Sequence, residues 1–156
     1  MGEIKAKTIA GVVIKPLKRF PDERGIVMHI LKATDEEFKG FGEVYCSGVY
    51  PGVIKGWHLH EKITLNYVVL TGMIKFVLFD ERENSPTHGV IQEIFMGEQN
   101  YVRVTVPPGI WNGFKGIGTE PALVCNVIDQ PHDEKEMRRC DPHHNHIPYD
   151  WARKDR

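Results

Sequence analysis

Short apolar stretches separated by turn residues run through most of the chain. Each stretch is rich in β-branched or aromatic residues, and breakers such as Pro51-Gly52 and Thr71-Gly72 lie between them. Runs of this length, bounded by Gly and Pro, are typical of β-strands. The pattern predicts strands at residues 11–14, 25–32, 43–50, 53–60, 64–70, 73–79, 90–95, 101–106, 110–114 and 122–128. Many short strands indicate a sandwich or a barrel, and the pattern alone does not distinguish the two.

Two segments carry helical signals. Thr34 followed by Glu37 has the capping-box pattern, so one short helix is expected after Thr34. A second helical turn is expected within residues 133–138, and the last fifteen residues, which hold two prolines and three histidines, are expected to be irregular.

Length and charge restrict the class of protein. A chain of 156 residues suits a single domain covering residues 1–156, because two domains would each be too small to bury much apolar surface. The formal net charge of −1 provides no field for nucleic acid or an anionic membrane, so neither is expected as a partner. Phosphates, if they bind, need a local basic pocket.

The cysteines and the first residues predict a cytoplasmic protein. Cys46, Cys125 and Cys140 are far apart and odd in number, which favours free thiols in a reducing compartment. The first fifteen residues lack the apolar core of a secretory signal peptide.

The sequence Gly-Trp-His-Leu-His at residues 56–60 is the strongest candidate for chemistry. Side chains alternate along a strand, so His58 and His60 share one face, and Trp57 and Leu59 share the other. Two imidazoles that point into a barrel need partners for four ring nitrogens, which favours a functional site over packing alone. The alternative is a solvated strand end.

A metal site is not favoured. Many cupins begin a metal site with HxH on a strand, but the positions where those sites continue are Leu65 and Asn112 here. Two histidines without a carboxylate or a third imidazole make a poor site for iron, manganese or zinc. We therefore expect no metal and no cofactor, and acid–base chemistry by an imidazole whose ordinary pKa is about 6.5.

Several motifs together resemble the dTDP-4-dehydrorhamnose 3,5-epimerase family of cupins. The run at residues 80–89, DERENSPTHG, matches the pattern DxRxxSPTxG at every fixed position. The resemblance spans about residues 12–151, and its other motifs are at residues 22–25, 47–58, 108–114 and 141–151. It implies an all-β, cupin-type jelly-roll barrel, a homodimer with exchanged strands, and a metal-free site. The implied reaction is epimerisation beside the ketone of a nucleotide-diphosphate-linked 4-keto-6-deoxy sugar.

The resemblance also assigns roles. His58 stands at the family's catalytic base, and Lys55 replaces its arginine as a cation for the diphosphate. Arg24 would meet the other phosphate or the nucleobase, or would form an ion pair with Asp22 or Glu23 in the turn. The pair of Asp80 and Arg82 is expected to order the 80–89 turn rather than to touch substrate.

Some family positions hold other residues. The family's general-acid tyrosine falls on Cys125, the histidine of its GFAHGF turn on Asn112, and an acidic residue after its DxRG turn on His29. The lysine that stabilises the enolate falls on Leu65. Cys125 is therefore a candidate acid, with a small core residue as the alternative.

The remaining site residues follow from these replacements. Asn112 and His60 are candidate hydrogen-bond donors to an enolate oxygen, and Ser47 and His29 complete the candidate substrate-binding set. The family's base-orienting aspartate has two candidates near the end of the chain, Asp155 and Asp150.

Three functions remain open. The first is epimerisation at C3, at C5 or at both, with His58 as the base. The second is a 3,4-ketoisomerase of a 4-keto-6-deoxy sugar nucleotide. The third is a barrel that binds a sugar nucleotide without turning it over, and the loss of the family's lysine and tyrosine favours it.

Overall fold

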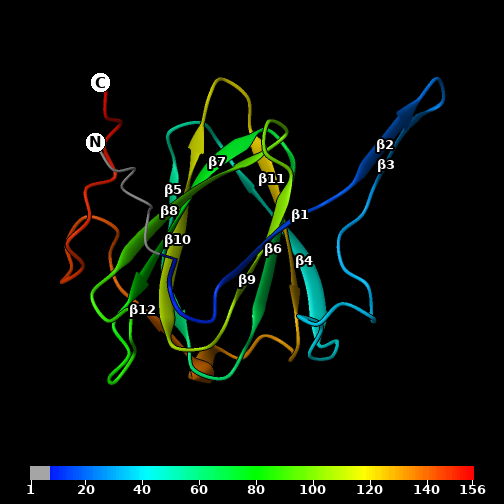
Figure 1. The fold of residues 1–156 in the computed structure, drawn as a ribbon. Coiled ribbons are helices and arrows are strands. Elements are labelled where there is room, and N and C mark those ends of the chain that lie inside the picture. The colour runs from blue at the N-terminus through cyan, green and yellow to red at the C-terminus, as the bar shows by residue number, and fades with distance from the viewer. Residues whose placement is uncertain (1–7) are drawn as a thin grey trace, which may run out of the picture.

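The computed structural model describes residues 8–156, and these form two antiparallel sheets packed face to face (Figure 1). The first sheet has the strand order β1-β9-β6-β11-β4, and the second has the order β12-β5-β10-β7-β8. The elements are β1 (Val13–Pro16), β2 (Arg19–Asp22), β3 (Gly25–Met28), β4 (Glu43–Val49), β5 (Ile54–His60), β6 (Leu65–Thr71), β7 (Met73–Asp80), β8 (Ile91–Gly97), β9 (Val102–Val106), β10 (Ile110–Ile117), β11 (Ala122–Ile128), the 3₁₀ helix η1 (Glu134–Glu136) and β12 (Met137–Arg139). The expected all-β, cupin-type barrel is confirmed.

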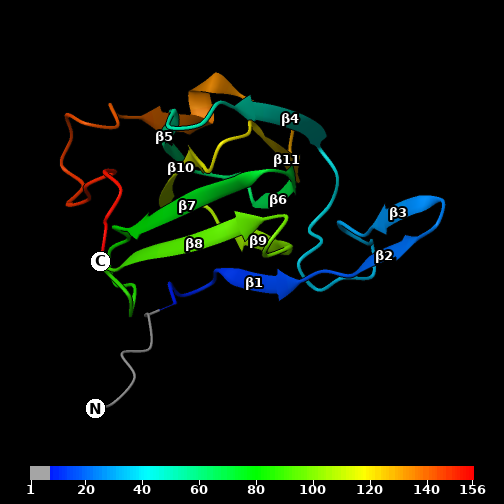
Figure 2. The same cartoon turned by 90° about the horizontal axis from the view of Figure 1, so that it is seen from above.

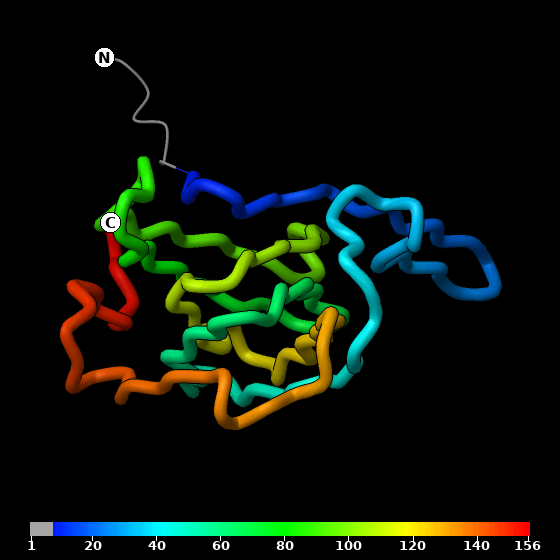
Figure 3. Tube along the Cα trace, turned by 90° about the horizontal axis from the view of Figure 1, so that it is seen from below, coloured from blue at the N-terminus to red at the C-terminus, as the bar shows by residue number. Residues whose placement is uncertain are grey.

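Alternation along the strands divides the core into two clusters. On β7, Ile74, Phe76 and Leu78 face the first sheet and belong to the larger cluster between the sheets. Val77 and Phe79 face outward and pack with Trp57 and Trp151 in a second cluster. The C-terminal segment covers this outer face of the second sheet (Figure 3). The two central strands of the second sheet, β7 and β10, are therefore buried on both sides along nearly their whole length.

Every predicted strand overlaps an observed one, and two strands were missed. The first is β2, whose four residues include Pro21 and are all exposed. The second is β12, a three-residue strand that pairs with β5. Both are too short and too polar to show an apolar pattern. The expected irregularity of the last fifteen residues is confirmed.

The helix expected after Thr34 is wrong, since turns occupy that segment. The side chains that would begin the helix are bound elsewhere. The Arg103 side chain, fully buried, donates to the carboxylates of Asp35 at 2.9 Å and Glu37 at 3.2 Å. A long-range ion cluster thus replaces the local cap. The second expected helical turn is present as η1, with the Asp133 carboxylate accepting from the backbone N–H of Lys135 at 2.9 Å.

Strands β2 and β3 form a hairpin that projects from the barrel, which we call the arm (Figure 2). Apolar side chains on it are open to solvent, with exposures of 51% for Phe20, 52% for Ile26 and 60% for Val27. Within residues 8–156, no helix is long and apolar enough to cross a membrane. The structure does not describe residues 1–7. The prediction that the first fifteen residues are no signal peptide therefore falls partly outside the described residues.

The turn at residues 80–89 is organised by Asp80. Its carboxylate is fully buried and accepts hydrogen bonds from Arg82 Nε at 2.9 Å and from the hydroxyls of Ser85 and Thr87, each at 2.6 Å. The Arg82 guanidinium also donates to the carbonyl of Ala10 at 2.7 Å, which ties the start of the described chain to the barrel. The structural interpretation of this motif is confirmed.

Candidate active site

A cavity of about 350 Å³ lies between the two sheets and is lined by residues of both. The first sheet contributes Glu43, Tyr45, Ser47, Tyr67, Val124 and Asn126. The second sheet and the loop before η1 contribute Lys55, His58, His60, Phe114, His132, Met137 and Arg139. A bound molecule would therefore meet one sheet on each side.

His58 faces this cavity from β5, as alternation along the strand predicts. Its ring is partly buried, and within residues 8–156 it has no hydrogen-bond partner. Burial, together with the positive charge of Arg139, lowers the pKa of His58 to about 4. The imidazole is neutral at pH 7, so a nitrogen lone pair is available to accept a proton.

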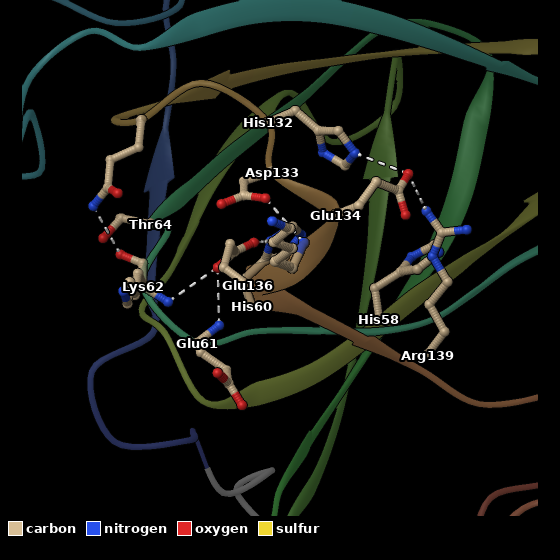
Figure 4. A network of polar contacts seen from close by, with 12 residues as sticks. His58, His60, Glu61, Lys62, Thr64, His132, Asp133, Glu134, Glu136 and Arg139 are labelled. Atoms are coloured by element: carbon tan, nitrogen blue, oxygen red, sulfur yellow. Dashed lines mark hydrogen bonds and ion pairs between the residues drawn. The ribbon is translucent and has the colours of Figure 1, made fainter.

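His60 lies on the same wall and is held by Glu136 (Figure 4). The second carboxylate oxygen of Glu136 accepts from the backbone N–H groups of Glu61 and Lys62, each at 3.0 Å. Burial raises the pKa of Glu136, but the His60 and backbone hydrogen bonds outweigh it and leave that pKa below its ordinary value. The carboxylate is ionised and can only accept, so His60 donates from Nδ1 and its orientation is fixed.

Two groups of charged residues border the cavity. The Lys55 ammonium donates to the Ser47 hydroxyl at 2.9 Å and so links β5 to β4 across the gap between the sheets. Near His58, Glu134 accepts from Arg139 at 3.3 Å and lies 3.4 Å from His132 (Figure 4). Lys55 and Arg139 are therefore two cations on the wall of one cavity.

A chain of polar contacts lies behind the first-sheet wall. The Thr105 hydroxyl donates to the Asn66 amide oxygen at 2.7 Å, and the backbone N–H of Asn66 donates to Asn126 Oδ1 at 3.1 Å. The Asn126 amide group in turn donates to the Tyr45 hydroxyl at 3.0 Å. All members except Tyr45 are buried, so the chain fixes the position of the phenol.

The structure does not bring five of the predicted site residues to the cavity wall. Arg24 is at the tip of the arm, where it pairs with Asp22 at 2.6 Å, as the alternative interpretation predicts. His29 packs edge-on against Phe20, with ring centroids 5.5 Å apart. Asp155 is exposed at the C-terminus and pairs with Arg153 at 2.8 Å.

The other two are directed away from a ligand. Cys125 lies on the outer face of β11 opposite Cys46, and burial raises its pKa to about 11. This corresponds to the alternative of a packing residue. The Asn112 amide donates to the backbone carbonyls of His58 at 3.1 Å and Ile110 at 3.4 Å, so it supports β5 from within the sheet. The other base-orienting candidate, Asp150, accepts from the backbone N–H of Ala152 at 2.9 Å.

Several lining residues were not foreseen. Tyr45 and Glu43 alternate with the same face as Ser47, so the rule that directs Ser47 inward applies equally to them. Arg139 on β12, and Glu136 in η1, which holds His60 without lining the cavity itself, carry no such local signal, because this segment reaches the site only where β12 pairs with β5.

The described residues contain free thiols at all three cysteines, as predicted. Across residues 8–156, no group of three or more His, Cys, Asp or Glu side chains is arranged to hold a metal ion.

The chain is similar to sugar epimerases of known sequence. Its residues 6–156 match the family model of dTDP-4-dehydrorhamnose 3,5-epimerase. It is 33% identical to a probable low-salt glycan biosynthesis epimerase of Haloferax volcanii, over 91% of this chain and 89% of that protein. It is 34% identical to the spore coat polysaccharide biosynthesis protein SpsL of Bacillus subtilis, over 83% of this chain and 89% of the relative.

Solved structures agree in fold. The crystal structure of a dTDP sugar isomerase from Desulfovibrio desulfuricans superposes with a TM-score of 0.90 at 38% identity, covering 94% of each chain. The structure of NovW, a 4-keto-6-deoxy sugar epimerase of Streptomyces spheroides, superposes at 0.83 with 20% identity over 93% of this chain and 76% of that one. The second likeness concerns the fold alone. The matched model spans nearly the whole chain, which therefore belongs to the dTDP-4-dehydrorhamnose 3,5-epimerase family and is an enzyme of the sugar-epimerase type.

Proposed function

We propose that the protein epimerises a nucleotide-linked 4-keto-6-deoxy sugar at C3, at C5 or at both, with His58 as the base. One observation carries this proposal: a neutral imidazole without a hydrogen-bond partner among residues 8–156 faces a cavity enclosed by both sheets. A carbon next to a ketone is acidic enough for a neutral imidazole to remove its proton, which leaves an enolate. The His60 ring lies on the same wall, where Glu136 fixes its orientation, and is a candidate hydrogen-bond donor to the enolate oxygen.

The two cations on the cavity wall support a diphosphate-linked substrate. Lys55 and Arg139 present an ammonium and a guanidinium, which are the groups that bind phosphate oxygens most strongly. One protein of similar fold, the 3'-monoepimerase ChmJ of Streptomyces bikiniensis, is described in complex with dTDP, as a double mutant, and in complex with dTDP-quinovose. We infer the same substrate class here, with the sugar between the sheets and the diphosphate at the two cations.

Solvent exchange tests the reaction. The protein is incubated in deuterated water with dTDP-, CDP- and GDP-linked 4-keto-6-deoxyhexoses. We expect deuterium to appear at C3 or C5 of at least one of these sugars. Proton NMR measures the loss of the corresponding proton signal. Deuterium at C4 together with movement of the carbonyl from C4 to C3 would instead identify a 3,4-ketoisomerase. Binding of a sugar nucleotide without any exchange would favour a binding barrel and contradict the proposal.

The low pKa of His58 predicts the pH dependence. Protonation disables a base, so kcat/KM should fall as the pH drops through the pKa of the free enzyme, about 4, and not near 6.5. In Arg139→Met, a neighbouring positive charge is lost, the pKa of His58 rises, and the acidic limb moves to higher pH. Circular dichroism at each pH separates this effect from unfolding. A limb near pH 6.5 in the unsubstituted protein would mean that the active imidazole is solvated.

Replacing Lys55 by Met is expected to weaken substrate binding more than chemistry. A lost charge-assisted contact to phosphate should raise KM roughly 10- to 100-fold, with a smaller change in kcat. Steady-state kinetics measure both values. Lys154→Met, at an exposed lysine outside the cavity, is the matched control and should change neither. A KM that stays the same in Lys55→Met would place the diphosphate elsewhere.

We further propose that the protein acts as a homodimer through the arm. The exposed apolar side chains of Phe20, Ile26 and Val27 support this, because a two-stranded hairpin with such a surface is marginally stable alone. In an exchanged dimer, Arg24 and His29, which do not line the cavity of their own chain, would be carried to the neighbouring chain.

A further inference from the structure

Inversion at a carbon needs a proton donor on the side opposite the base. His58 belongs to the second sheet, so the donor must come from the wall that the first sheet provides. That wall presents two phenols to the cavity, Tyr45 from β4 and Tyr67 from β6. The position that the family resemblance assigns to the acid, Cys125, is on the far face of β11. Glu43 on the same wall accepts a hydrogen bond from the backbone N–H of His132 at 2.9 Å and is assigned to that contact, so the choice lies between the two tyrosines.

The amide of Asn126 determines which way the Tyr45 hydrogen points. A backbone N–H can only donate, so the contact from Asn66 N at 3.1 Å fixes the oxygen of the Asn126 amide on that side. The amide nitrogen must then face Tyr45, at 3.0 Å from the phenol oxygen. Since that oxygen accepts from Asn126, its own hydrogen is directed elsewhere, and the open direction is the cavity.

The same contact stabilises the oxygen after the proton has left. Burial raises the pKa of Tyr45, and the hydrogen bond from Asn126 acts in the opposite direction, because it favours the phenolate. A fixed donor aimed at developing negative charge needs no reorganisation during the reaction.

Tyr67 lacks this arrangement. Its ring packs against Phe76 and Phe114, with centroids 4.9 and 6.2 Å apart. Burial raises its pKa far above the ordinary value, and among residues 8–156 no group donates a hydrogen bond to its hydroxyl. Loss of its proton would leave a phenolate without a stabilising donor. Tyr67 serves as an apolar wall of the cavity.

From this geometry we infer that Tyr45 is the catalytic acid and Asn126 its positioning residue, which rests on the epimerase reaction proposed above. His58 takes the proton of the C–H bond, and the electron pair of that bond moves into the enolate. The enolate pair then forms a new C–H bond on the opposite face with the proton of Tyr45, whose O–H bond breaks to leave a phenolate. Afterwards the imidazolium releases its proton to water and the phenolate takes one from water, which restores both groups.

The test separates inversion from exchange. In Tyr45→Phe, His58 still removes the proton and returns a solvent deuteron to the same face. With a 4-keto-6-deoxyhexose nucleotide that the unsubstituted protein turns over, inversion is expected to fall roughly 10²- to 10⁴-fold. Deuterium should still enter the substrate, with its configuration retained. Tyr67→Phe makes the same chemical change on the same wall and should lower inversion far less than Tyr45→Phe does.

Asn126→Asp tests the positioning role. It retains the oxygen that accepts from Asn66 but replaces the donor to Tyr45 by an acceptor, which turns the phenol hydrogen away from the cavity and disfavours the phenolate. Inversion should fall, and the alkaline limb of kcat/KM should move to higher pH, a shift that a structural defect alone would not cause.

Several outcomes overturn the inference: inversion at the normal rate in Tyr45→Phe, loss of both inversion and exchange in that variant, or a loss of inversion in Tyr67→Phe as large as in Tyr45→Phe with exchange retained. Each of these leaves the proposed epimerase function standing. The absence of exchange in the unsubstituted protein would instead refute that function.

Discussion

Replacing His58 by Asn is expected to lower both isotope exchange and epimerisation by roughly 10²- to 10⁴-fold, which is the usual contribution of a general base. Asparagine keeps a polar side chain of similar size but has no nitrogen lone pair to accept a proton. The His58 ring has no hydrogen-bond partner among residues 8–156, so the substitution breaks no such contact of the described fold. The thermal unfolding midpoint should therefore stay close to that of the unsubstituted protein.

The measurement is proton NMR of deuterium uptake in parallel with a thermal melt. His144→Asn, at an exposed histidine of the C-terminal segment, provides the same chemical change outside the cavity and should retain full activity. Exchange that continues in His58→Asn at the original rate would show that another group removes the proton.

Replacing Asp80 by Ala is expected to cause the largest loss of stability, about 3 kcal/mol in the free energy of unfolding. The carboxylate is fully buried, and its removal leaves Arg82, Ser85 and Thr87 without their acceptor. The estimate is at the low end for a broken buried pair because the Arg82 side chain is 27% exposed and water can partly solvate it.

Urea denaturation at pH 7 measures this loss, and its pH dependence gives a second check. Burial raises the pKa of Asp80, but the hydrogen bonds from Arg82, Ser85 and Thr87 outweigh it, so the net pKa lies below the ordinary value. The stabilisation is then fully present above the unfolded-state pKa of about 4 and is lost as the pH falls through the lower native value. Asp22→Ala, which breaks an ion pair exposed on the arm, should leave the free energy of unfolding nearly unchanged. An equal loss in the two variants would contradict the role of burial.

The sequence predicted most of the fold because the signal is local. Apolar runs bounded by Gly and Pro identify strands wherever one face or both faces are buried, and all ten predicted runs overlap strands. The helix after Thr34 failed because Arg103, far along the chain, binds Asp35 and Glu37. Capping residues were judged from their neighbours alone, and no local pattern reveals that a buried guanidinium binds these carboxylates.

The candidate site was predictable in part for the same reason. Alternation along β5 directs His58 inward, and the family motif identifies it as the base. Transfer of a role by counting along the chain is less secure, because an offset of one residue moves a side chain to the other face of a sheet. On β11, Val124 and Asn126 line the cavity and Cys125, which lies between them, does not. No sequence pattern joins Glu136 to His60, which are 76 residues apart.

The position of β12 bears on how the protein is made. During translation, β1 to β11 leave the ribosome before residues 134–139 do, and each can pair as soon as its neighbour is available. The edge of the cavity that carries Arg139 and the carboxylate that orients His60 are added only afterwards. A released chain that ended at residue 133 would keep His58 on a β5 that pairs with β10, yet without the guanidinium beside it or the support for its neighbour.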